Sequence, residues 1–195
     1  SALAGSIYRL REDERALFDS IGEEVTRTTQ SDHAAFYLLE ADGVTGRVVS
    51  EYPPRGLAGT TVELAGSLLA EPLHQLQAGA EGPIVINDSA TNTRLSETVR
   101  AGLAQSGAHA LLFIPYRVNE RLAGLAVFSR EGKSPSYEPD MLTIGRTISA
   151  ELSVGLQNIH GADIGIKLPG PPSQLGPNRR QPALKQNPDL VGVQM

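Results

Sequence analysis

Two pairs of β-rich segments, each joined by a short turn, constrain the fold of this chain more than any other feature. Residues 34–39 and 47–52 flank the turn at Asp42-Gly43, and residues 108–116 are followed closely by residues 121–128. Short connections of this kind join antiparallel neighbours. The segment 108–116 is apolar at almost every position, so it must be covered from both sides. The chain therefore needs an antiparallel sheet with cover on both faces.

Amphipathic helices are predicted at both ends of the folded part. Leu10, Leu17, Ile21 and Val25 recur four or seven residues apart, which predicts a helix near residues 8–30. A similar spacing from Met141 to Ile159, preceded by a start signal at residues 136–140, predicts a long closing helix.

Shorter elements fill the middle of the chain. Helices are predicted over residues 67–76, with Ser67 as the N-cap, and from about residue 95 to Gly107, and a strand over residues 83–86. The resulting order predicts an α+β domain, an antiparallel sheet with helices packed on its faces.

The composition changes near residue 160. Residues 161–195 hold six Pro and five Gly but no aromatic residue, so they cannot bury an apolar face. We expect one folded domain at residues 1–160 and a Pro/Gly-rich disordered tail or linker at residues 161–195. The start at Ser1 suggests either a piece excised from a longer chain or the remnant of a tag.

The remaining composition excludes several classes of function. The chain has no Cys, which rules out disulfides, thiolate metal sites, a thiol nucleophile and a thioether-linked chromophore. With 17 Lys+Arg against 22 Asp+Glu, it offers no basic surface for nucleic acid. No apolar stretch approaches membrane-spanning length, so we expect a cytoplasmic protein with no membrane contact.

Five segments together resemble a GAF domain. They are residues 66–74, the strand exit at residues 83–88, residues 107–116, residues 121–128 and the helix at residues 137–159. The resemblance implies a PAS-related antiparallel sheet of five or six strands with helices on both faces and long terminal helices. It also implies a pocket on the face opposite the terminal helices, and small-molecule or chromophore sensing within signalling proteins such as sensor histidine kinases.

The polar loop after residues 83–86 is the candidate ligand site, because free backbone and side-chain groups gather where a buried strand ends. We expect Asn87, Asp88, Thr91, Asn92 and Arg94 to face a ligand. The apolar or stacking walls would be Phe36, Phe113 and Tyr116. Two alternatives stay open: Asp88 serves only to hold the turn, and Arg94 pairs with Asp88 or Glu97.

Of the four histidines, His109 is the best candidate for the site, because it begins the central strand. The histidines lack the spacing of a metal motif, so no metal is expected. Without Cys, covalent bilin attachment and the Cys-dependent sulfoxide reductase activity found within the family are excluded. No cofactor is expected beyond a non-covalent small molecule of unknown identity.

The terminal helices predict a homodimer. Their apolar stripes would pair across two copies, and the small residues Gly145, Ala150, Ser153 and Gly155 would allow close approach. The leading hypothesis is thus a non-catalytic sensory module that signals through these helices. The alternatives are a structural dimerisation domain without a ligand and, last, a small hydrolase or transferase using Asp88, Arg94 and His109.

Overall fold

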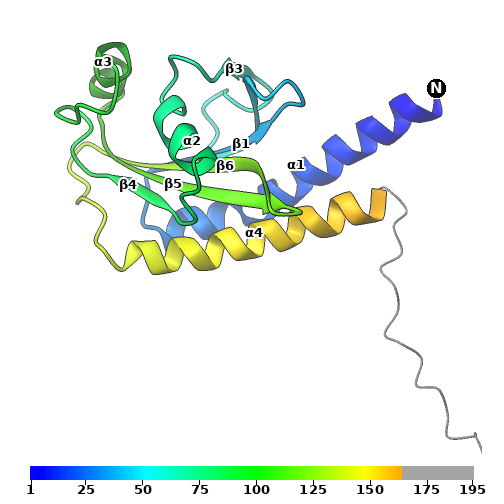
Figure 1. Ribbon diagram of the computed structural model, residues 1–195. Coiled ribbons are helices and arrows are strands. Elements are labelled where there is room, and N and C mark those ends of the chain that lie inside the picture. Colours follow the sequence, from blue (N-terminus) through cyan, green and yellow to red (C-terminus); the bar gives the residue numbers. More distant parts are fainter. Residues whose placement is uncertain (164–195) are drawn as a thin grey trace, which may run out of the picture.

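The sheet has six strands in the order β3-β2-β1-β6-β5-β4, and every neighbouring pair is antiparallel. This arrangement comes from a computed structural model that describes residues 1–163 (Figure 1). The strands are β1 (His33–Leu39), β2 (Thr45–Tyr52), β3 (Thr61–Glu63), β4 (Ile84–Ile86), β5 (Ala108–Val118) and β6 (Arg121–Glu131). The helices are α1 (Ala2–Thr28), α2 (Ala70–Gln77), α3 (Glu97–Ser106) and α4 (Met141–Asp163). The predicted α+β class, an antiparallel sheet of five or six strands with long terminal helices, is confirmed.

Helices cover both faces of the sheet, as predicted. The long terminal helices α1 and α4 lie antiparallel to each other on one face, and the short helices α2 and α3 lie on the other (Figure 1). The N-terminal part of α1 projects past the sheet and diverges from α4 (Figure 1), whose C-terminal part lies against the middle of α1, where His160 Nε2 is 3.3 Å from Glu14 Oε2. Both chain-terminal helices therefore leave the sheet at the same end.

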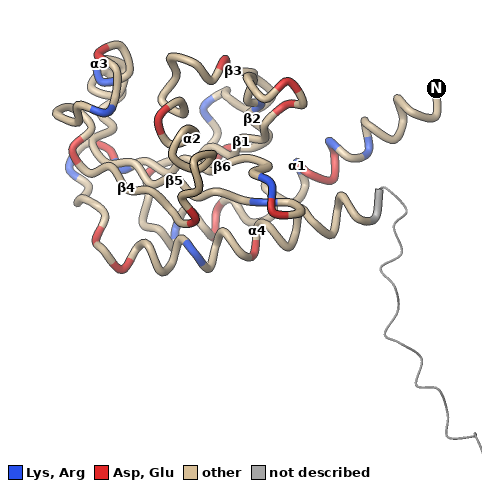
Figure 2. Tube along the Cα trace, in the orientation of Figure 1, with Lys and Arg blue, Asp and Glu red and all other residues tan. Residues whose placement is uncertain are grey.

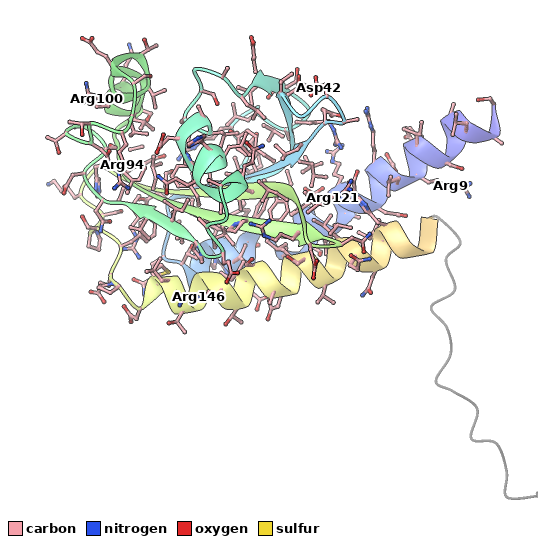
Figure 3. All side chains as sticks on the ribbon, in the orientation of Figure 1. Arg9, Asp42, Arg94, Arg100, Arg121 and Arg146 are labelled. Carbon is pink, nitrogen blue, oxygen red and sulfur yellow. The ribbon has the colours of Figure 1, made fainter. Side chains whose placement is uncertain are left out.

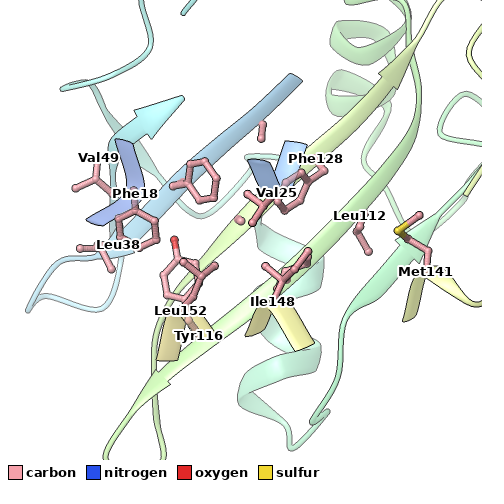
Figure 4. Packing of buried hydrophobic residues seen from close by; sticks show 14 of the residues in the cluster. Phe18, Val25, Leu38, Val49, Leu112, Tyr116, Phe128, Met141, Ile148 and Leu152 are labelled. Atoms are coloured by element: carbon pink, nitrogen blue, oxygen red, sulfur yellow. The ribbon is translucent and has the colours of Figure 1, made fainter. Parts of the chain in front are cut away.

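The sheet separates two apolar layers. On the α1/α4 side, the ring of Phe18 packs between those of Phe36 and Tyr116, with centroids 5.2 Å apart in each pair (Figure 4). The phenol of Tyr116 donates a hydrogen bond to the carbonyl oxygen of Tyr37 across the sheet. On the α2/α3 side, leucines from the short helices and loops pack against residues such as Phe113 and Leu125.

Several elements differ from prediction. The helix α1 begins at Ala2, whereas its predicted start was near residue 8. The short strand β3 was not expected, because three residues are too few to show an alternating pattern. Ser67 does not cap α2, which begins at Ala70; its hydroxyl instead accepts from the Leu69 amide within the preceding turn. The helix α4 continues to Asp163, beyond the predicted boundary at 160, and the rest of the predicted tail lies outside the described residues.

The small residues of α4 pack mainly within their own chain. An added Cβ at Gly145 would lie 2.7 Å from Pro83, and one at Gly155 would lie 3.0 Å from Leu17 of α1. The hydroxyl of Ser153 accepts from the Arg117 amide at 2.9 Å. At these three positions α4 approaches other segments of its own domain closely.

Candidate functional site

A cavity opens between the first turn of α2 and the loop that leads into α3. Its volume is about 260 Å³, and it is lined by Gly66, Ser67, Ala70, Glu71, Arg94, Leu95, Ser96 and Val99. Ser96 is the N-cap of α3 and accepts from the Val99 amide at 3.2 Å, which fixes this edge of the cavity. The cavity therefore combines an apolar floor with hydroxyl groups, one carboxylate and one guanidinium.

Arg94 is the predicted site residue that this cavity contains. It lies in the loop before α3 and is exposed (Figure 3). Within residues 1–163 it forms no ion pair, so neither Asp88 nor Glu97 neutralises it. A free guanidinium at the mouth of a small cavity is suited to a carboxylate or phosphate.

The other polar residues of the loop mostly shape the backbone. The Asn92 side chain accepts from the Arg94 amide at 2.9 Å, an Asx turn that presents Arg94. The amide of Thr91 donates to the Asp88 carbonyl oxygen at 3.1 Å, and the Asp88 side chain is exposed. Asp88, Thr91 and Asn92 thus hold the turn, and none of them lines the cavity.

Asn87 points away from the cavity. Its side-chain amide donates to the Tyr137 carbonyl oxygen at 2.9 Å, and its carbonyl oxygen accepts from the Tyr137 amide at 2.8 Å. Both polar atoms of the side chain are therefore occupied by the segment that precedes α4. The expectation that Asn87 faces a ligand together with Arg94 is corrected.

His109 is at the opposite end of the loop. It sits at an irregularity in the pairing of β5 with β6, and its carbonyl oxygen accepts from the Ser89 amide at 3.1 Å. Its Nε2 atom is buried without a hydrogen-bond partner among residues 1–163. His109 does not line the cavity at Arg94.

The predicted aromatic walls do not share a surface. Phe113 lies in the layer under α2 and α3, whereas Phe36 and Tyr116 lie in the layer under α1 and α4. Successive side chains of a strand point to opposite faces, so residues 113 and 116 cannot line one pocket. Phe36 and Tyr116 are core residues on the side away from the cavity, and their assignment as pocket walls is corrected.

A buried charged cluster occurs elsewhere, at the ends of β1 and β2. The Glu51 carboxylate accepts from His33 Nε2 at 3.1 Å and from the backbone amides of Arg55, Leu57 and Ala58. Burial opposes ionisation of Glu51, but these hydrogen bonds outweigh it and lower the pKa of the carboxyl. Burial lowers the pKa of His33, and the hydrogen bond that His33 donates to Glu51 acts in the opposite direction. The cluster holds the loop after β2 in place.

Residues 1–163 contain no group of three His, Cys, Asp or Glu side chains placed to hold a metal ion. In the same part of the chain, no helix combines the length and apolar character needed to cross a bilayer.

Sequence reasoning missed the α2 side of the cavity. Ser67, Glu71 and Ser96 reach it from three separate segments. Glu71 lies in the first turn of α2. An acidic residue at that position is typical of a helix start, so the sequence indicates a structural role for Glu71 and gives no sign that it lines a cavity. Only the fold brings these residues to Arg94.

Comparison with known proteins agrees with this architecture. The family model described as GAF domain matches residues 13–156. None of the curated proteins matches the chain. The blue-light absorbing form of the PixJ GAF domain from Thermosynechococcus elongatus superposes with a TM-score of 0.65 at 17% identity, covering 79% of this chain and 90% of that chain.

Two further structures show the same fold. The GAF domain/HD domain protein from Geobacter sulfurreducens gives a TM-score of 0.61 at 10% identity, with 76% of this chain and 94% of that chain covered. A phycoerythrobilin-bound GAF domain from a cyanobacterial phytochrome gives 0.62 at 17% identity, with 81% and 94% covered. At these identities the structures show the fold alone, whereas the family model covers most of the chain. This chain therefore belongs to the GAF domain family.

Proposed function

We propose that this chain is a non-catalytic sensory module of a larger signalling protein, such as a sensor histidine kinase. It binds a small molecule non-covalently on the α2/α3 face of the sheet and signals through α1 and α4 on the other face. One observation carries the proposal: the guanidinium of Arg94, which has no ion-pair partner among residues 1–163, lines a cavity on the face of the sheet opposite α1 and α4.

The cavity limits the chemistry of the ligand. Pockets for drug-sized molecules hold about 300–1,000 Å³, and this cavity, at about 260 Å³, suits a smaller metabolite. Arg94 favours a carboxylate or phosphate on that molecule, and Ser67 and Ser96 supply hydroxyl partners. The phycoerythrobilin of the cyanobacterial neighbour is a poor guide to this ligand, because the present chain has no Cys and fills the α2/α3 layer with leucines.

Native mass spectrometry of the purified protein, followed by a thermal-shift screen of small carboxylates and phosphates, tests ligand binding. At a ligand concentration about 100 times Kd, binding stabilises the fold by about 2.7 kcal/mol. For a domain of this size that corresponds to a rise in Tm of roughly 5–10 °C.

Two arginine variants locate the site. Arg94→Ala removes the cavity cation and should abolish the shift, while Arg121→Ala, which removes an exposed arginine far from the cavity, should retain it. No bound species and no shift across the screen would contradict the sensory function. A shift that survives Arg94→Ala would move the site elsewhere.

We also propose that the module works as a homodimer, joined along the N-terminal part of α1. Leu3 and Ile7 are 72% and 48% exposed, and Leu10 continues their stripe at heptad spacing. Exposed apolar side chains at this spacing are typical of a helix that pairs with another helix.

Sedimentation of Ile7→Glu tests the dimer. The variant should be monomeric at concentrations where the wild type is dimeric, whereas Arg9→Glu, on the opposite side of the helix, should remain dimeric. A monomeric wild type contradicts the dimer. A dimer without any ligand supports the alternative function, a structural dimerisation domain.

The charge distribution favours these partners over nucleic acid. In the part of the chain that the structure describes, Lys and Arg are scattered among Asp and Glu without a continuous basic segment (Figure 2). Phosphate contacts supply most of the affinity for DNA and RNA, so we expect neither to bind.

A further inference from the structure

We propose that five residues couple the loop beside the cavity to the inner ends of both terminal helices. They are Asn87, Tyr137, Ser31, Thr29 and Arg130, called here the helix-end network. This inference rests on the proposed sensory function, because it identifies the connection through which a change at the loop reaches α1 and α4.

The first connection joins the loop to α4. Asn87 follows β4 directly, and its side chain makes two hydrogen bonds with the backbone of Tyr137, at 2.8 and 2.9 Å. This pairing resembles that of two neighbouring β-strands, so it fixes both the position and the rotation of the segment. Met141, the first residue of α4, follows four residues later. A shift of residues 87–94 is therefore transmitted to the start of α4.

The second connection joins Tyr137 to α1. The Tyr137 hydroxyl lies 2.6 Å from the Ser31 hydroxyl, which lies 2.8 Å from the Thr29 hydroxyl, and Thr29 donates to the Val25 carbonyl oxygen at 2.9 Å. Each hydroxyl has one hydrogen, so the donors run in one direction, from Tyr137 through Ser31 and Thr29 to Val25. Thr29 is the C-cap of α1. The chain of bonds ends inside the last turn of that helix.

Arg130 closes the network from β6. One terminal nitrogen donates to the carbonyl oxygens of Pro135 and Ser136, at 3.1 and 2.8 Å, and the other donates to that of Thr29 at 2.9 Å. Its guanidinium carbon lies 4.1 Å from the centroid of the Tyr137 ring. Arg130 is 3% exposed, so its cation depends on these partners in both segments. The end of α1 and the approach to α4 are thus bound to one another.

The other end of the loop lies at the cavity. Asn92 holds the Arg94 amide, and Arg100 of α3 donates to the Asn92 carbonyl oxygen at 3.4 Å. Residues 87–94 therefore connect the cavity cation at one end with Asn87 at the other. A ligand that moves Arg94 would act on the helix ends through a short, hydrogen-bonded segment.

Amide hydrogen exchange on the intact protein tests the coupling without a ligand. Asn87→Ala should raise exchange of the Gln30 and Ser31 amides about tenfold or more relative to the wild type. Rates are normalised to the Leu112 and Phe113 amides of β5, so that a global loss of stability is subtracted. The matched control is Thr93→Ala, at an exposed position of the same loop that contributes to none of these hydrogen bonds, and it should leave exchange in residues 28–32 unchanged.

Coupling between two sites is reciprocal, so the converse experiment, a change at the end of α1 with a readout in the loop, provides a second test. Ser31→Ala should raise exchange of amides in residues 88–94, whereas Ser134→Ala, which removes a neighbouring hydroxyl outside the network, should not. Asn87→Asp keeps the acceptor but loses the donor, so its effect should be intermediate, and it serves if Asn87→Ala does not fold.

The results separate coupling from local fastening. If Asn87→Ala raises exchange only in residues 135–141, or if Ser31→Ala leaves residues 88–94 unchanged, the network fastens loops locally and the proposal is overturned. The exchange experiment uses no ligand. If it shows coupling while the separate binding screen finds no ligand, this inference stands and only the sensory function is contradicted.

Discussion

Gly124 on β6 marks the tightest point of the sheet, and Gly124→Ala tests the packing most severely. An added Cβ would collide with the carbonyl oxygen of Tyr37, lie 2.6 Å from the Tyr116 ring and 3.0 Å from the Cα of Leu38. Two of these three atoms belong to the backbone of β1, so no rotamer change relieves the contact. The strands β1 and β6 must separate, or Tyr116 must leave its position.

Either movement breaks the buried hydrogen bond from Tyr116 to Tyr37. Overpacking of this kind costs about 1–3 kcal/mol, and leaving a buried polar group without its partner costs about 1–3 kcal/mol more. We therefore expect a loss of about 2–6 kcal/mol, a large part of the roughly 5–15 kcal/mol that stabilises a typical domain.

Urea unfolding followed by circular dichroism measures the change. The matched control is Gly102→Ala on α3, where an added Cβ meets nothing within 4 Å and a helical alanine should gain up to about 1 kcal/mol. An unchanged unfolding midpoint for Gly124→Ala would refute the packing described for β1, β5 and β6.

Two further predictions concern pH. Burial lowers the pKa of His33, so the unfolded chain binds the proton more readily and stability should fall as pH drops below about 6.5. His33→Gln should flatten this part of the profile of stability against pH, measured by urea unfolding. An unchanged slope would contradict the burial of His33. Burial raises the pKa of Tyr137 from 10.0 to about 12, so up to about 3 kcal/mol of stability should be lost between those values. Tyr137→Phe should reduce that alkaline loss in thermal melts, and a profile equal to the wild type would show that Tyr137 does not carry it.

Much of the fold could be predicted because its signals are local. The apolar spacing from Leu10 to Val25 and the Asp42-Gly43 turn each lie within one element or hairpin, where periodicity and turn chemistry apply directly. Gly124 lies in residues 121–128, one of the segments that carry the family resemblance. The contacts that require glycine there, with Tyr37 and Tyr116, come from other strands and cannot be inferred from that segment.

The candidate site was predictable only in part, because its contacts join distant segments. Arg94 was identified from a polar loop after a strand, and it does line the cavity. Asn87 belonged to the same loop, yet its partner Tyr137 is 50 residues away, and nothing in the loop's composition indicates that pairing. The separation of Phe113 from Tyr116 was available from the sequence, since residues three apart on a strand point to opposite faces.

The central claim is that a small molecule on one face of the sheet changes the relative position of the helices on the other. The chain has no Cys, so Arg9→Cys and Asn158→Cys give two spin labels, on exposed positions of α1 and α4, without background. Electron–electron double resonance, with labelled protein diluted in unlabelled protein, reads the distance within one chain.

The probe is the carboxylate or phosphate that gives the largest thermal shift. We predict that saturating the protein with this compound shifts or narrows the distribution of distances between the two spin labels, and that Arg94→Ala removes this effect. A distribution that stays the same while the compound saturates the protein would contradict the claim.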